Sequence, residues 1–94
     1  MQINIQSIHF DADKKLLQFI RQKIEKLKTF NQDLQNAEVF LRIGAASDAA
    51  NKLVELKVHL PGHILFASDQ SKSFEEATDH CAESVRRQLE KLKP

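Results

Sequence analysis

Two basic segments contain the residues whose chemistry is easiest to name. RQKIEKLK occupies residues 21–28 and RRQLEKLK occupies residues 86–93. In each, Lys and Arg side chains surround an apolar stripe at helical spacing. Two interpretations fit such segments. Cations near the end of a helix stabilise it by about 0.3–1 kcal/mol through the helix dipole. Two positive faces on one domain can also neutralise the phosphates of a nucleic acid.

The histidines and the cysteine do not form a recognisable metal or catalytic site. His59 and His63 flank a Pro-Gly turn and can approach each other, but no Cys or carboxylate stands at the spacing of a zinc site. Cys81 lies on an apolar stripe, and on a helix the adjacent His80 would point about 100° away from it. A buried thiol that packs as a small apolar group therefore fits better than an activated nucleophile. We expect no metal, no cofactor, no small-molecule substrate and no enzymatic activity.

The composition describes one small domain over residues 1–94. Hydrophobic residues make up 41% of the chain and the formal net charge is +1, which argues against disorder. Charge is segregated, because residues 14–28 hold six Lys or Arg and one Glu, whereas residues 69–83 hold five acids and one Lys. A single cysteine fits a reducing compartment, and no apolar run reaches the ~18–20 residues of a membrane span. We expect a cytoplasmic protein that does not enter membranes.

Hydrophobic periodicity predicts four strands and two helices. Alternation with a period of two marks the strands, and apolar residues at helical spacing mark the helices. The first helix would begin after Asp11 or Asp13 and the last after Ser71 or Ser73, because these side chains cap free amides. The predicted elements are strands at 2–8, 37–43, 53–60 and 63–68, a loop at 44–51, a turn at Pro61-Gly62, and helices at 14–30 and 74–92.

The order of these elements, β-α-β-β-β-α, defines an α+β fold. Both helices have a single apolar stripe and each strand has an apolar face, so the economical packing places both helices on one face of a four-stranded mixed sheet. The helical crossover makes the first two strands parallel, and the remaining neighbours are antiparallel. The inward face of 63–68 stays open, because Ile64 and Phe66 compete with Leu65 and Ala67.

Such a fold favours folded or double-stranded RNA over single strands. Double-stranded-RNA-binding modules also present cations from helices that flank a small sheet, and they read duplex shape and phosphates. Aromatic evidence for single-strand binding is poor, because the chain has no Trp or Tyr. Phe40 and Arg42 share an outward strand face and leave a small stacking platform open.

The segments QFIRQKIEKLKTF, LPGHILFAS and VRRQLEKLK, in this order and spacing, resemble the family of ribosome hibernation-promoting factors and ribosome-associated inhibitors, also called sigma-54 modulation proteins. The resemblance runs from the QINI strand to the final RQLEKLK, and is to the short type without a second, dimer-forming domain. It implies a double-stranded-RNA-binding-like fold and no catalysis. It also implies binding to the small ribosomal subunit in the channel for messenger RNA and tRNA, which silences translation in stressed or resting cells.

The resemblance implies RNA-binding roles for basic residues on both helices. The matching positions are Lys23, Lys26, Arg87 and Lys91, with Arg21, Lys28, Arg86 and Lys93 as neighbouring candidates. Asp79 matches a family acid with a structural or surface role. Glu75, Thr78 and Ser84 stand where relatives often have Tyr, Ile and Lys, so a lost cation and an added acid should weaken attraction for phosphate. The expected partner is the small ribosomal subunit, bound through rRNA by a chain that is monomeric off the ribosome.

One alternative class of function stays open. The first half of the last helix is acidic, and a protein–protein adaptor would use that surface while the basic ends remain solvated. The acidic residues are Glu75, Glu76, Asp79 and Glu83. Partners retained after nuclease digestion would indicate an adaptor, whereas RNA-dependent retention would indicate an RNA-binding protein.

Overall fold

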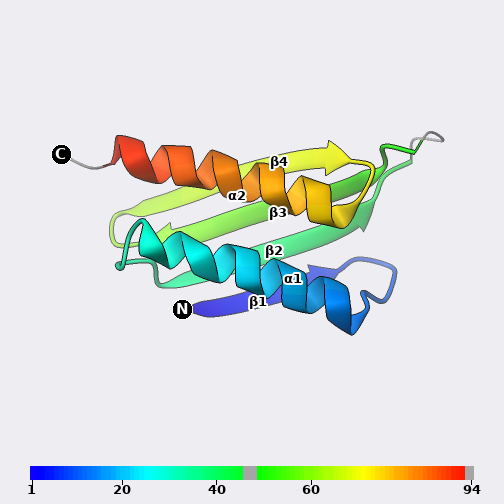
Figure 1. Cartoon of the computed structure of the whole chain (residues 1–94), viewed down its shortest axis with the longest axis horizontal. Coiled ribbons are helices and arrows are strands. Elements are labelled where there is room, and N and C mark those ends of the chain that lie inside the picture. The colour runs from blue at the N-terminus through cyan, green and yellow to red at the C-terminus, as the bar shows by residue number, and fades with distance from the viewer. Residues whose placement is uncertain (46–48, 93–94) are drawn as a thin grey trace.

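The structure, a computed structural model, describes residues 1–45 and 49–92 and contains one four-stranded sheet. The strands lie in the order β1-β2-β3-β4, with β1 parallel to β2 and the other neighbours antiparallel (Figure 1). Their bounds are Gln2–Ser7 for β1, Asn36–Ile43 for β2, Lys52–Leu60 for β3 and His63–Ser71 for β4. The predicted α+β fold, its β-α-β-β-β-α order and its mixed sheet are therefore confirmed.

Two helices lie side by side on the same face of this sheet (Figure 1). α1 spans Lys14–Glu25 and continues as a 3-10 turn, η1, over Lys26–Thr29, whereas α2 spans Phe74–Lys91. The caps in use are Asp13, whose carboxylate accepts from the Leu16 amide at 2.8 Å, and Ser73, whose hydroxyl accepts from the Glu76 amide at 3.0 Å. In the described part of the chain, neither helix has the length and apolar composition needed to cross a bilayer.

The α-helix predicted over 14–30 ends earlier than expected, at Glu25. In the following turn, the Thr29 hydroxyl donates to the Lys26 carbonyl at 2.7 Å, a local bond that competes with regular helical bonding. A tighter 3-10 turn is common at such helix ends. Leu27 nevertheless remains buried, so η1 extends the apolar stripe of α1.

The hydrophobic core lies between the sheet and the helical layer. Its largest fully buried side chains include Ile20 and Ile24 from α1, Leu56 from β3 and Leu89 from α2. The open question about β4 is resolved by its pairing with β3, which sets Leu65 opposite Val58 and Ala67 opposite Leu56. Leu65 and Ala67 therefore face inward, whereas Ile64 and Phe66 are 64% and 51% exposed on the other face.

Each edge strand receives a hydrogen bond from a helix side chain. On β1, Arg21 donates from Nη1 to the Ile3 carbonyl at 2.9 Å, and on β4, Gln88 donates from Nε2 to the Phe66 carbonyl at 3.0 Å. These bonds occupy backbone acceptors that could otherwise pair with another strand. The loop predicted at 44–51 is closed by a bond from the Gly44 amide to the Asn51 carbonyl at 2.7 Å, and residues 46–48 lie outside the described residues.

Candidate nucleic-acid interface

A hollow of about 350 Å³ lies between the two helices, and we call it the helix groove. Its apolar lining comes from Leu27 on η1, from Phe30 just after η1, and from Ala82 on α2. Charged side chains of both signs complete it, at Lys23, Lys26, Asp79, Glu83 and Arg86. Three of the predicted RNA-binding residues therefore meet in the helix groove, but carboxylates lie among them.

Lys23 is paired across the helix groove. Its Nζ lies 3.1 Å from Asp79 Oδ1 and 5.5 Å from the centre of the Phe19 ring. The Lys23 and Asp79 side chains remain 36% and 48% exposed, so this is a solvated pair, a type worth about 0–1 kcal/mol. Asp79, predicted to be a structural or surface acid, thus connects α2 to α1 and offsets the charge of Lys23.

Arg86 is held more firmly than any other cation of the helix groove. Its Nε and Nη2 donate to the two carboxylate oxygens of Glu83 at 2.9 and 2.6 Å, and Nη1 donates to Glu90. The guanidinium also lies 5.8 Å from the centre of the Phe30 ring. Hydrogen bonding to Glu83 raises the pKa of Arg86, and the same bonds lower the pKa of Glu83. Arg86 is therefore largely neutralised by its own helix.

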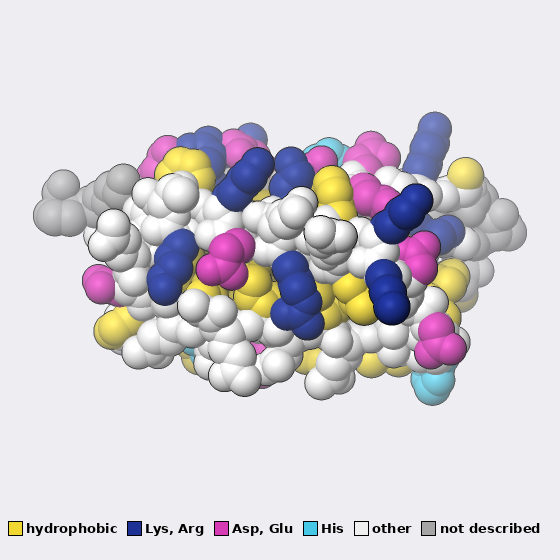
Figure 2. Space-filling model, turned by 60° about the horizontal axis from the view of Figure 1, so that its bottom comes forward, with side chains coloured by type: hydrophobic (Ala, Val, Ile, Leu, Met, Phe, Trp, Pro, Cys, Tyr) yellow, Lys and Arg dark blue, Asp and Glu magenta, His cyan; other side chains and the backbone are white. Residues whose placement is uncertain are grey.

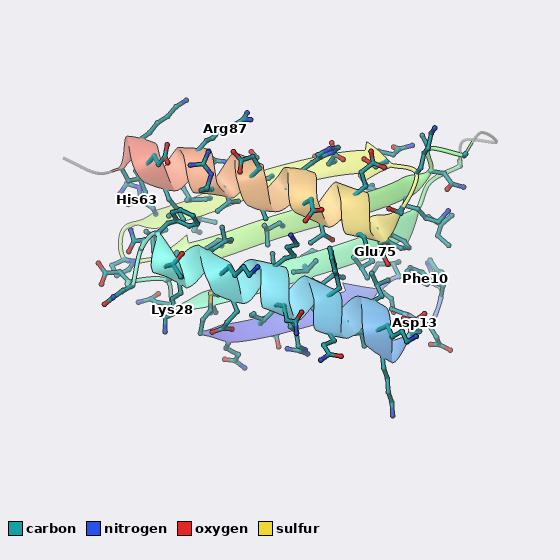
Figure 3. All side chains as sticks on the ribbon, in the orientation of Figure 1. Phe10, Asp13, Lys28, His63, Glu75 and Arg87 are labelled. Carbon is teal, nitrogen blue, oxygen red and sulfur yellow. The ribbon has the colours of Figure 1, made fainter. Side chains whose placement is uncertain are left out.

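A second group of predicted residues lies on the β1 side of α1. Arg21 belongs there, because it reaches the Ile3 carbonyl at the free edge of β1. Lys28, on η1, is labelled on the same side of the helical layer in Figure 3. Figure 2 views the molecule from this side and shows dark blue side chains spaced along it, with yellow apolar side chains between them. The cations of this flank form a dispersed row.

The third group lies on the opposite flank, where α2 borders β4. Arg87 is labelled on the side of α2 that faces away from α1 in Figure 3. Its side chain is 69% exposed, with one contact of 3.5 Å from Nε to Glu83. Lys91 is exposed, and among the described residues neither Lys91 nor Lys26 forms an ion pair with a carboxylate. The predicted residue Lys93 lies outside the described residues.

The sequence pattern did not reveal how many acids lie among these cations. Asp79, Glu83 and Glu90 each form an ion pair with a predicted RNA-binding residue. The i to i+3 and i to i+4 spacing of Glu83 and Glu90 from Arg86 is a signal that could have indicated two of these pairs. The two basic helices share one face of the sheet, yet their cations divide between the helix groove and two flanks.

A separate polar cluster ties α2 to β4. His80 Nδ1 lies 2.8 Å from Asp69 Oδ2, and the Ser71 hydroxyl donates to the same oxygen at 2.6 Å. Asp69 raises the pKa of His80 through this bond and through its charge. Because serine and histidine both bind one carboxylate oxygen, the arrangement does not activate the hydroxyl, and it acts as a clamp between two elements.

The buried thiol and the histidine pair at the turn show no reactive geometry. Cys81 is buried as predicted, and burial raises the pKa of its thiol to about 12. Such a thiol is almost never ionised near neutral pH and makes a poor nucleophile. His59 bonds to Glu38 at 3.3 Å. Over residues 1–45 and 49–92, no group of three or more His, Cys, Asp or Glu is placed to hold a metal.

Together these features define the class of protein as a small α+β domain of β-α-β-β-β-α order, with basic residues on both helices of its helical layer. Comparison with solved structures agrees. A ribosomal subunit interface protein from Coxiella burnetii superposes with a TM-score of 0.84 at 21% identity, covering 97% of this chain and 96% of that one. The N-terminal domain of Protein Y from Thermus thermophilus gives a TM-score of 0.84 at 18% identity, covering 99% and 100%. These likenesses show a shared fold.

The family follows from the sequence comparison. The profile of the sigma 54 modulation protein / S30EA ribosomal protein family matches residues 3–94, so the chain belongs to this family. A ribosome hibernation promoting factor from Pseudomonas putida is 24% identical over 93 residues, covering 99% of this chain and 87% of that protein. Neither the family description nor the name of this relative indicates catalytic activity.

Proposed function

We propose that this protein binds the small ribosomal subunit through rRNA, occupies the channel for messenger RNA and tRNA, and inhibits translation as a hibernation factor. The observation that carries the proposal is that both helices bear cations and lie side by side on one face of a single sheet. A folded RNA that contacts the helical layer would meet both basic segments at once. Such a factor acts in the cytoplasm, where ribosomes are, and as a monomer off the ribosome.

The cations differ in how much charge they can offer to phosphate. Lys26 and Lys91 form no ion pair within the described residues, and Arg87 has only its 3.5 Å contact with Glu83. These three carry most of the binding in our proposal, with Lys23 contributing less because Asp79 competes for it. Arg86 is held by Glu83 and Glu90. In our proposal it fixes the shape of the helix groove and contributes little to phosphate binding.

One added acid, Glu75, and one missing cation, at Ser84, explain why the affinity should be moderate. Glu75 is exposed, and Figure 3 labels it at the start of α2 on the side facing α1. Ser84 is uncharged, and its hydroxyl oxygen accepts a hydrogen bond from Gln88 Nε2 at 3.3 Å. Each carboxylate near a bound phosphate repels it, and each missing cation removes one released counterion, about 0.9 in the log–log salt slope.

The protein–protein adaptor is the less favoured class. Its acidic surface would include Asp79 and Glu83, but both are already paired with cations of this chain. Burying these pairs under a partner would require desolvating charges that water now solvates. Binding that survives nuclease treatment would nevertheless support the adaptor and count against rRNA.

Co-sedimentation with small ribosomal subunits tests the proposal. The test variant combines Lys26→Glu, Arg87→Glu and Lys91→Glu. The matched control combines Lys52→Glu, Lys57→Glu and Lys72→Glu, which changes the net charge equally but acts on β3 and the β4–α2 connection. We expect the test variant to lose binding and translation inhibition, and the control to retain both. Circular dichroism verifies that both variants fold, and equal binding by the two would refute the assignment.

A further inference from the structure

A second hollow, of about 260 Å³, lies at the free edge of β1, and we call it the β1-edge hollow. It is lined by Asn4, Ile5, Gln6, Arg21, Glu38 and Phe40. Its lining therefore comes from β1, β2 and α1 and belongs to neither the helix groove nor the flank of α2. Sites for drug-sized ligands measure roughly 300–1,000 Å³, so this one suits a smaller ligand, such as a single nucleotide.

The strand register explains how these side chains come together. β1 and β2 pair in parallel, with Asn4 opposite Glu38 and Gln6 opposite Phe40, so all four side chains lie on the face of the sheet away from the helices. Arg21 comes from the helical side and reaches the Ile3 carbonyl at the edge. Ile5 is two residues along, so its backbone N–H and C=O point off the same free edge. The hollow thus connects the open face of the sheet with the basic flank of α1.

The chemistry of this lining matches an unpaired base with its phosphate. Phe40 supplies an aromatic face, on which any base can stack. The side-chain amides of Asn4 and Gln6 can both donate and accept hydrogen bonds at a base edge. The bond to Ile3 uses one of the five N–H donors of Arg21 and orients its planar guanidinium, a group suited to phosphate.

Glu38 gives the hollow a preference among bases. Its carboxylate only accepts hydrogen bonds when ionised, and it is oriented by the contact with His59 at 3.3 Å. Carboxylates accept from the exocyclic amino group of cytosine in base recognition. Adenine and guanine also carry an amino group. Uracil carries none, and its one edge donor, N3–H, lies between two carbonyl oxygens that a carboxylate repels, so uracil should bind more weakly.

We propose that the β1-edge hollow binds one unpaired RNA base that carries an exocyclic amino group, with Phe40 stacking on the base, Glu38 accepting from its amino group and Arg21 contacting its phosphate. This inference rests on the proposed binding to rRNA and deepens it. The helical cations would hold folded RNA by its phosphates, and the hollow would select a flipped-out base at the edge of the same domain.

Binding of labelled oligonucleotides tests the hollow directly. The probes are fluorescein-labelled octamers of cytidine and of uridine ribonucleotides, and fluorescence anisotropy measures their affinity for the full chain. We expect the cytidine octamer to bind at least about fivefold more tightly than the uridine octamer, the discrimination of one good base contact. Equal affinities, or no measurable binding of either octamer, would overturn the proposal.

Two matched pairs of variants locate the effect. Glu38→Met should bring the cytidine-to-uridine ratio to about one, whereas Glu55→Met, which removes a carboxylate on the same face paired with Arg42, should leave the ratio unchanged. Phe40→Leu should weaken both octamers about fivefold or more, whereas Phe66→Leu, at another exposed ring of that face, should not. If the members of either pair behave alike, the hollow is not the site.

The same variants separate this inference from the proposed function. If Glu38→Met and Phe40→Leu leave the octamers unaffected while the reversal of Lys26, Arg87 and Lys91 abolishes subunit binding, the hollow is excluded and the ribosomal proposal stands. If that reversal leaves subunit binding intact, the ribosomal proposal fails whatever the octamers show.

Discussion

The ion pair between Lys23 and Asp79 gives a prediction in which stability and RNA affinity change in opposite directions. Asp79→Asn keeps the shape and one acceptor oxygen of the side chain but removes its charge. The folded protein loses a solvated pair with an Nζ to Oδ1 distance of 3.1 Å. Exposed pairs contribute about 0.2–1 kcal/mol, which lowers the melting temperature of a domain this size by a few degrees.

The same substitution should strengthen binding to the small subunit. A phosphate about 4 Å from the Lys23 ammonium gains about 1 kcal/mol in a dielectric close to that of water, and Asp79 now largely cancels this gain. Removing the carboxylate should therefore tighten binding about fivefold, because 1.4 kcal/mol corresponds to a factor of about ten. If Lys23 then contacts a phosphate, the log–log salt dependence steepens by about 0.9.

The assay is co-sedimentation with small ribosomal subunits between about 50 and 200 mM salt, alongside thermal unfolding of the free protein. The control is Asp11→Asn, which makes the same change in charge at an exposed residue that does not cap α1. Equal tightening in both variants would show a net-charge effect with no role for the helix groove. Weaker binding of Asp79→Asn would refute the reasoning, because Asp79 would then be orienting Lys23 for phosphate.

Two further predictions concern residues that hold the helices in place. Arg86→Met should lower the unfolding midpoint, since Glu83 and Glu90 lose their shared partner. It should nevertheless reduce subunit binding less than Arg87→Met does. If Arg86→Met reduced subunit binding more, Arg86 would be a direct RNA contact. Asp69 raises the pKa of His80 above its ordinary 6.5, so this ion pair stabilises the fold fully below pH 6.5 and is lost as pH rises through the raised pKa. Denaturant titrations at about pH 6 and pH 8.5 should show this difference, and His80→Gln should remove it.

The fold could be predicted where one side of an element is clearly apolar. In β3, Val54, Leu56 and Val58 alternate with charged residues and are buried as expected. In β4 both sets of alternate residues are apolar, so only the pairing with β3 decides that Phe66 faces outward. Periodicity cannot supply this information, because register is a long-range property of the sheet.

The candidate site was harder to predict, because a sequence pattern tells which cations avoid the core but not which flank they occupy. In the first basic segment, Arg21 reaches the edge of β1, while Lys23 enters the helix groove. In the second segment the equivalent positions exchange these roles. Arg86 lies in the helix groove over the Phe30 ring, and Gln88 reaches the edge of β4.

This exchange has a simple geometric cause. Both helices run in the same direction, with their apolar stripes on the same sheet (Figure 1), so equivalent positions of the two segments point in the same direction. A side chain that points into the helix groove from α1 therefore points to the outer flank when it stands at the equivalent position of α2. Lys26 and Lys91 are also equivalent, but they do not lie level with each other. Lys23 meets Asp79 and Arg86 meets Phe30 across the helix groove, so Lys26 lies opposite the middle of α2, and Lys91 lies more than two helical turns farther along the helical layer. One helix can provide only a row of cations along its axis. A second basic helix beside the first turns this row into a two-dimensional array of cations. Such an array suits a rigid polyanion such as folded RNA, which is recognised through phosphates that are themselves arranged in two dimensions.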